Sequence, residues 1–89
     1  MANSYRVAFR QQWWPTTALH PRPTFEQLTA EAPVRYLEDR FYNPEMARRA
    51  CRLLVGGDGP EVTRTETGLR SEIKTTITPG TKLTEGWVE

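Results

Sequence analysis

One stretch of the sequence decides the fold: Asn43–Gly57, which reads NPEMARRACRLLVGG. Asn43 can accept a hydrogen bond from a free backbone N–H at a helix start, and Pro44 has the fixed φ that suits the first helical position. Gly56 can adopt the positive φ that ends a helix. We therefore expect the main helix of the chain over residues 43–55.

This helix has an apolar side and a basic side. Its apolar residues recur at i, i+4, i+7 and i+8, and are Met46, Ala50, Leu53 and Leu54. Its basic residues are Arg48, Arg49 and Arg52. We expect the apolar stripe to pack on the core and the arginine side to be a solvated face, with contact to a protein partner or to a nucleic acid as alternatives.

Strands are predicted before and after the helix. Residues 4–10, SYRVAFR, alternate apolar and polar side chains, which is typical of a strand with one buried face. Residues 61–66 and 69–78 are expected to form a hairpin about the Thr67-Gly68 turn. The inner face of its second arm is Leu69, Ser71, Ile73, Thr75 and Ile77. The tail, residues 81–89, is expected to be either a short edge strand or a mobile end.

Two short helices are predicted ahead of the main one. Thr24 and Gln27 have the spacing of a capping box, followed by a short helix from Phe25 to about Ala30. Residues 34–42 are interpreted as the second short helix, because Val34, Leu37 and Phe41 recur at helical spacing.

The elements add up to one α+β domain over residues 1–89. An antiparallel sheet of three to four strands, made of the N-terminal strand and the C-terminal hairpin, packs on helix 43–55. A core of this size leaves little margin of stability, so a partner or a second copy of the chain can supply part of it.

Charge and hydropathy limit the functional classes. The net charge of +1 is far from the strongly basic balance of a typical nucleic-acid-binding domain, although the first 55 residues carry eight arginines against five acidic residues. No apolar run approaches the ~20 residues that span a membrane, and no apolar signal segment follows Met1. A cytoplasmic location is therefore expected.

No catalytic or metal-binding pattern stands out. One cysteine and one histidine cannot supply the ligands of a structural zinc site. Cys51 lies beside the apolar stripe of the helix, where a small buried thiol without a base is expected. His20 lies in an irregular segment, where a solvated or hydrogen-bonded side chain is expected. We expect no catalytic residue, no metal and no cofactor.

The strongest functional signal is the irregular segment 11–23, QQWWPTTALHPRP. Its three prolines break helical and strand periodicity, and long irregular connections are often functional. Trp13 and Trp14 stand in tandem, and adjacent side chains in such a segment diverge, so both cannot easily reach the core. Tryptophan is enriched at binding hot spots. The pair is expected either to close one end of the core or to anchor a partner.

These observations favour a non-enzymatic protein–protein interaction module. It would be a small accessory subunit, adaptor or inhibitor that docks on a larger assembly, of the kind carried by phages or other mobile elements. The expected partner-binding residues are Trp13, Trp14, Arg48, Arg49 and Arg52.

Two alternatives stay open. One is an RNA- or single-stranded-DNA-binding module, because arginines can contact phosphates. Its expected binding residues are Arg6, Arg10, Arg48 and Arg52. The other is a small enzyme whose site forms across a homo-oligomer.

Overall fold

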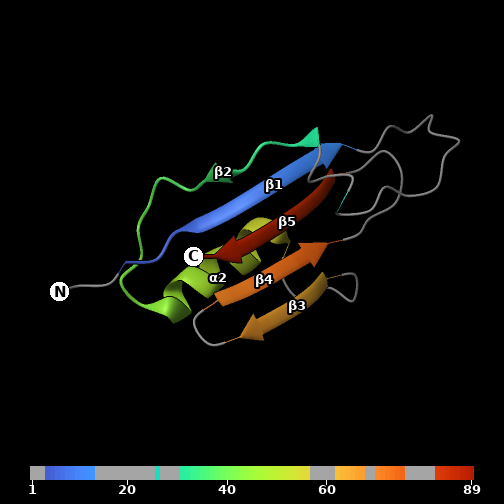
Figure 1. Cartoon of the computed structure of the whole chain (residues 1–89). Coiled ribbons are helices and arrows are strands. Elements are labelled where there is room, and N and C mark those ends of the chain that lie inside the picture. The colour runs from blue at the N-terminus through green and yellow to red at the C-terminus, as the bar shows by residue number, and fades with distance from the viewer. Residues whose placement is uncertain (1–3, 14–25, 27–30, 57–61, 68–69, 76–81) are drawn as a thin grey trace, which may run out of the picture.

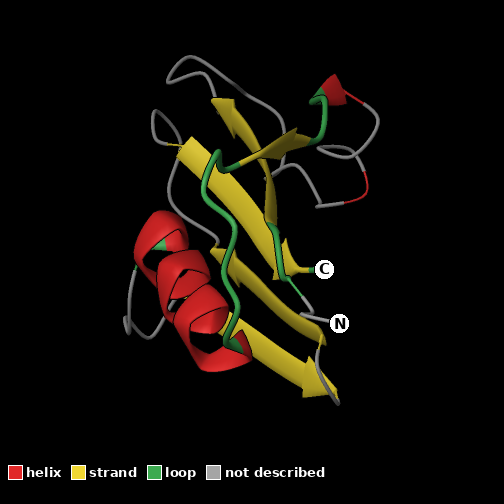
Figure 2. Ribbon diagram, turned by 90° about the vertical axis from the view of Figure 1, so that its left-hand side faces the viewer, coloured by secondary structure: helices red, strands yellow, loops and turns green. Residues whose placement is uncertain are grey.

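The structure is a computed structural model, and it describes residues 4–13, 26, 31–56, 62–67, 70–75 and 82–89. In this part of the chain, five strands form one antiparallel sheet, and helix α2 (Pro44–Val55) packs across one face of it (Figure 1, Figure 2). The strands are β1 (Val7–Trp13), β2 (Arg35–Tyr36), β3 (Val62–Thr67), β4 (Arg70–Thr75) and β5 (Lys82–Val88). From edge to edge their order is β2-β1-β5-β4-β3. The predicted α+β architecture is confirmed, with five strands in place of three or four.

Helix α2 begins and ends as the sequence predicts. The side chain of Asn43 accepts a hydrogen bond from the backbone N–H of Glu45 at 2.8 Å, and Pro44 occupies the first turn. Gly56 has a φ of +131°, and its N–H donates to the carbonyl of Arg52 at 3.0 Å. These caps are local, so they follow from the residues themselves.

The predicted packing face of α2 is wrong. Met46 is 52% exposed and Leu53 is 74% exposed, although both belong to the stripe expected to meet the core. The buried residues of the helix are instead Ala47, Arg48, Cys51 and Val55. Ala50 and Leu54 are half-buried at the margin of this face. The helix is therefore rotated, so that its smaller side chains meet the sheet.

The reason for this rotation lies at Gly86 of β5. A Cβ atom added to Gly86 would lie 3.0 Å from the Sγ of Cys51 and 3.0 Å from a methyl carbon of Val55. Glycine on the strand and small side chains on the helix let the two backbones approach closely. Close packing of α2 on β5 thus decides which side of the helix is buried.

Strand β5 lies at the centre of the sheet and not at an edge. It pairs with β1 from Val7↔Val88 to Trp13↔Lys82, and with β4 from Glu72↔Trp87 to Thr75↔Thr84. The expectation of an edge strand or mobile end for the tail is therefore wrong over residues 82–89. The cause is pairing on both sides, which buries even its polar residues.

Strand β1 begins and ends three residues further along the chain than predicted. It continues through Gln11 and Gln12 to Trp13, because these residues pair with Thr84, Leu83 and Lys82 of β5. The first three residues of the segment predicted to be irregular are thus strand. Residues 14–23 of that segment lie outside the described residues.

The helix predicted for residues 34–42 is wrong. Arg35 and Tyr36 form β2, which pairs with Phe9 and Ala8 of β1. Further on, Phe41 forms an antiparallel bridge with Tyr5. A helix of nine residues is marginal on its own, whereas an extended chain gains hydrogen bonds along the edge of β1. The other short helix lies outside the described residues, except for Glu26, which is helical.

Strands β3 and β4 pair as the predicted hairpin. Thr67 pairs with Arg70, so Thr67 belongs to β3 and not to the turn predicted at Thr67-Gly68. Ser71, Ile73 and Thr75 are buried on one face, as predicted. The other two residues of that predicted face, 69 and 77, lie outside the described residues.

Candidate functional site

The solvent side of α2 carries an exposed surface that we call the outer stripe: Met46, Arg49 and Leu53. These residues are spaced i, i+3 and i+7, so they share one side of the helix, opposite Cys51. Met46 and Leu53 are among the large hydrophobic residues that the structure exposes, and Arg49 between them is also exposed. The outer stripe therefore combines two apolar anchors with one fixed positive charge.

Arg48 does not belong to this surface, which corrects its predicted role as a solvated or partner-binding residue. The residue is 9% exposed, and its Nε donates to the hydroxyl of Ser71 on β4 at 2.7 Å. Its Nη1 pairs with the carboxylate of Glu45 one turn earlier. Because Ser71 is fully buried, its hydroxyl requires a partner inside the protein. Arg48 therefore joins the helix to the sheet.

Trp13 is exposed at the end of β1. Two thirds of its surface, 67%, is accessible, and the ammonium of Lys82 lies 5.7 Å from the ring centroid. Trp13 therefore does not close the core, whereas Trp14 lies outside the described residues. Trp13 is four residues, about 13 Å along the strand, beyond Phe9, which pairs with Gly86 beneath α2. The predicted partner-binding residues thus lie in different places: Trp13 on β1, Arg49 and half-buried Arg52 on α2.

Arg6 and Arg10 lie on the face of the sheet turned away from α2. Val7 between them packs with Ala47 in the core, and side chains alternate along a strand. The guanidinium of Arg6 stacks 3.9 Å from the ring centroid of Tyr36. Arg48 and Arg52 belong to the helix on the other face. The four arginines expected to bind a nucleic acid therefore do not form one surface.

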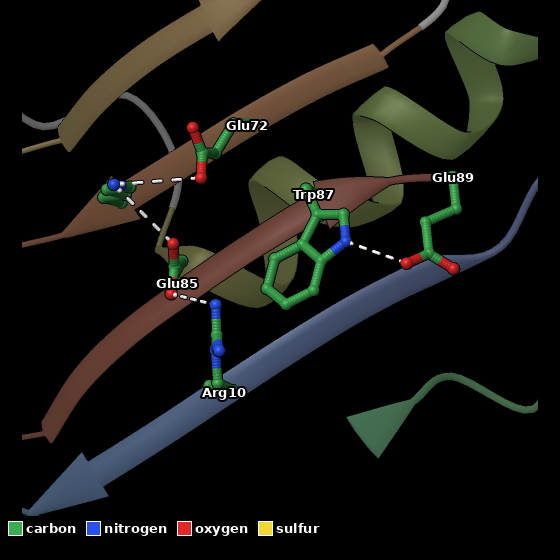
Figure 3. A network of polar contacts seen from close by, with 6 residues as sticks. Arg10, Glu72, Glu85, Trp87 and Glu89 are labelled. Atoms are coloured by element: carbon green, nitrogen blue, oxygen red, sulfur yellow. Dashed lines mark hydrogen bonds and ion pairs between the residues drawn. The ribbon is translucent and has the colours of Figure 1, made fainter. Parts of the chain in front are cut away.

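Glu85 is the centre of a charged network on this face (Figure 3). One of its oxygens lies 3.1 Å from Arg10 Nη2 and the other 3.6 Å from Lys74 Nζ, which also lies 3.7 Å from Glu72. Arg10 and Lys74 are the cross-strand partners of Glu85 in β1 and β4. The network therefore links three strands and supports their register.

Burial sets the electrostatics of Glu85, whose surface is only 3% exposed. Burial raises the pKa of this carboxyl group, and the positive charge of Arg10 opposes that rise. Among the described residues, Arg10 Nε and Glu85 Oε2 each lack a hydrogen-bond partner, so the contact between Arg10 Nη2 and Glu85 Oε2 is an ion pair without an aligned hydrogen bond. Sequence reasoning missed this site because it depends on the central position of β5.

Trp87 lies beside the charged network of Glu85 and takes part in two further contacts. The guanidinium of Arg10 lies 4.9 Å from the ring centroid of Trp87, and the indole N–H of Trp87 donates to Glu89 at 3.1 Å. Trp87 is itself buried. These contacts join side chains of the neighbouring strands β1 and β5, so we assign the network to the register of the sheet.

Cys51 is the only cysteine of the chain, and it is fully buried, as predicted. Burial raises its pKa to about 11, against a weaker opposing effect of Arg52. The thiol is therefore protonated at neutral pH and is a poor nucleophile. His20 lies outside the described residues.

Two further features are absent from the part of the chain that the structure describes. No group of three or more His, Cys, Asp or Glu side chains in this part of the chain is placed to hold a metal ion. No helix in it is long and apolar enough to cross a membrane.

Comparisons with protein-family models, with curated proteins and with solved structures gave no match for this chain.

Proposed function

We propose that the protein is a non-enzymatic interaction module, an accessory subunit, adaptor or inhibitor, that docks on a larger protein through the outer stripe of α2. The observation that supports this most directly is the exposure of Met46 and Leu53 on one side of a capped, packed helix. The side chains that the core requires are already supplied by the opposite side of α2. Met46 and Leu53 are therefore available to a partner.

The spacing of the stripe suits a known mode of recognition. A helix that binds in a groove uses apolar anchors at i, i+3, i+4 or i+7, and Met46 and Leu53 are seven residues apart. Removing one such side chain from water contributes about 1.5–3 kcal/mol. Two anchors of this kind can form the centre of an interface, where a few residues dominate affinity.

Charge on the helix indicates the character of the partner. Arg49 lies between the two anchors and Arg52 lies beside them, whereas the nearby Glu45 is engaged with Arg48. The exposed side of α2 is therefore basic as well as apolar. We infer that its partner offers an apolar groove with an acidic rim.

Trp13 is a candidate for a second, separate contact. It is exposed at the far end of β1, and tryptophan is the residue type most enriched at hot spots. A partner large enough to cover both places would bind through two surfaces. Variants at Trp13 and at the outer stripe distinguish one contact from two.

The proposal is tested by comparing Leu53→Asp with Val34→Asp in affinity capture from lysate of the source organism. Val34 is also an exposed apolar residue, 42% accessible, but it lies outside α2, so it controls for the added charge. We expect a partner that wild type and Val34→Asp retain and Leu53→Asp loses, while circular dichroism shows all three folded. Calorimetry with the purified partner should then show at least about a tenfold loss of affinity. Equal capture by all three proteins would refute the proposal.

A further inference from the structure

Strand β3 is an edge of the sheet whose outer side has no neighbour among the described strands. It is six residues long, whereas β2 at the opposite edge has two. Residues 63–67 of β3 are all exposed. An edge of this length offers a row of backbone N–H and C=O groups to another strand. The question is which strand fits it.

The sequence of β3, VTRTET, is self-complementary about Thr65. Arg64 precedes this residue and Glu66 follows it. We propose that β3 pairs antiparallel with β3 of a second copy of the chain, across a two-fold axis at Thr65. Arg64 of each copy then lies directly opposite Glu66 of the other, which gives two cross-strand ion pairs.

The charges also select this register over its neighbours. A shift by two residues in one direction places Arg64 opposite Arg64, and a shift in the other direction places Glu66 opposite Glu66. Like charges directly opposite each other destabilise a strand pair. A shift by one residue would turn the side chains of the second copy to the other face. Of these registers, the one about Thr65 alone satisfies both conditions.

Residues on the other side of the strand agree with this register. It places Thr65 opposite Thr65 and Thr63 opposite Thr67, and cross-strand threonine pairs are favourable. In this register even-numbered residues lie opposite even-numbered ones, and odd-numbered residues lie opposite odd-numbered ones. Alternate residues of a strand point their backbone N–H and C=O groups to the same side, so the outward groups of one copy meet those of the other. Charged side chains on an edge strand, often lysine, usually discourage pairing, but charges of opposite sign can pair when the register places them directly opposite each other. Strand β3 carries one charge of each sign.

The dimer would contain one sheet that continues across both chains, with β3 next to β3. A two-fold axis through the edge runs perpendicular to the sheet, so both α2 helices lie on the same face. The outer stripes stay uncovered and can bind two sites at once. A single strand pair is a small interface, so the dimer is expected to dissociate in about the micromolar range or above.

Charge exchange tests the pairing by sedimentation equilibrium over a range from about 10 µM to about 1 mM. We expect wild type to be a reversible dimer. Arg64→Glu and Glu66→Arg, each alone, should weaken self-association about tenfold or more, because each places like charges together. An equimolar mixture of the two variants should associate again, and so should the double variant Arg64→Glu/Glu66→Arg.

Glu38→Arg is the control, since Glu38 is exposed and lies outside β3. It should dimerise as wild type does, and circular dichroism should show every variant folded. Restored association in the mixture cannot arise from a folding defect. The inference is overturned if wild type stays monomeric over this range, if the single variants dimerise unchanged, or if the mixture fails to associate.

Discussion

Gly86 of β5 faces Cys51 of α2 so closely that a Cβ on the glycine would lie 3.0 Å from the thiol sulfur. The same Cβ would lie equally close to Val55, so two side chains of the helix would have to move. This contact fixes the rotation of α2. That rotation buries the small residues and exposes Met46 and Leu53.

Gly86→Ala should therefore destabilise the fold. Overpacking of a filled interior costs about 1–3 kcal/mol, and we expect a loss in this range in urea denaturation. In a Cys51→Ala background the sulfur is gone from the crowded space. Gly86→Ala should therefore lower the free energy of unfolding less in that background than in wild type. If Gly86→Ala is as stable as wild type, the close approach of helix and strand is refuted.

Arg48→Ala should lower the free energy of unfolding by about 1–3 kcal/mol, since it leaves the buried hydroxyl of Ser71 without its donor. Arg49→Ala, one residue further on the exposed side, is the matched control and should change stability by no more than about 0.5 kcal/mol. Urea denaturation of both variants makes the comparison. Equal effects would contradict the different places given to these two arginines.

The free energy of unfolding should depend on pH through Glu85. Its pKa is raised in the folded protein, mainly by burial, so its ionisation disfavours the folded state. The stabilising contribution of Glu85 is then complete below the ordinary pKa of glutamate, about 4.3, and is lost as the pH rises through the higher folded value.

The matched variant for this prediction is Glu85→Gln, which cannot titrate. The unfolding free energy of wild type minus that of Glu85→Gln should fall as the pH rises from about 4 toward neutrality. Urea denaturation at a series of pH values measures this difference. A difference that is constant or rises with pH would show that the pKa is not raised.

Cys51 should react slowly with thiol reagents in the folded protein, because it is buried and its pKa is raised to about 11. Unfolding in denaturant should make its labelling fast. The control is Leu53→Cys in a Cys51→Ser background, which places a thiol two residues away on the exposed side and should label at once. Rapid labelling of native wild type at pH 8 would contradict the assigned core.

The parts of the fold that depend on neighbouring residues could be predicted from the sequence. Asn43, Pro44 and Gly56 act within one turn, so both ends of α2 were correctly predicted. Alternation in β1 and β4 likewise identified strands. The side of α2 that packs on the sheet could not be found this way, because periodicity identifies several faces and the fit to Gly86 selects one of them.

The candidate site, too, could be predicted only where it does not depend on residues that are distant in the chain. The exposure of Trp13 and Arg49 was among the predicted alternatives, but burial of Arg48 depends on Ser71, 23 residues away in the chain. The sequence predicts Met46 and Leu53 in the core, because apolar side chains usually belong there, whereas both are exposed. Their exposure depends on the smaller residues of α2 that fill that place against the sheet, which sequence periodicity does not identify.

The most direct test of the central claim, that the outer stripe of α2 is the partner-binding surface, is site-specific photocrosslinking. A photoreactive phenylalanine derivative replaces Leu53 in one protein and Val34 in another, and both are irradiated in lysate of the source organism. Crosslinked products are compared by mass spectrometry. We expect a defined partner attached at position 53, absent at position 34 and lost when Met46→Asp is added. A product that forms equally at both positions, or at position 34 alone, would contradict the claim.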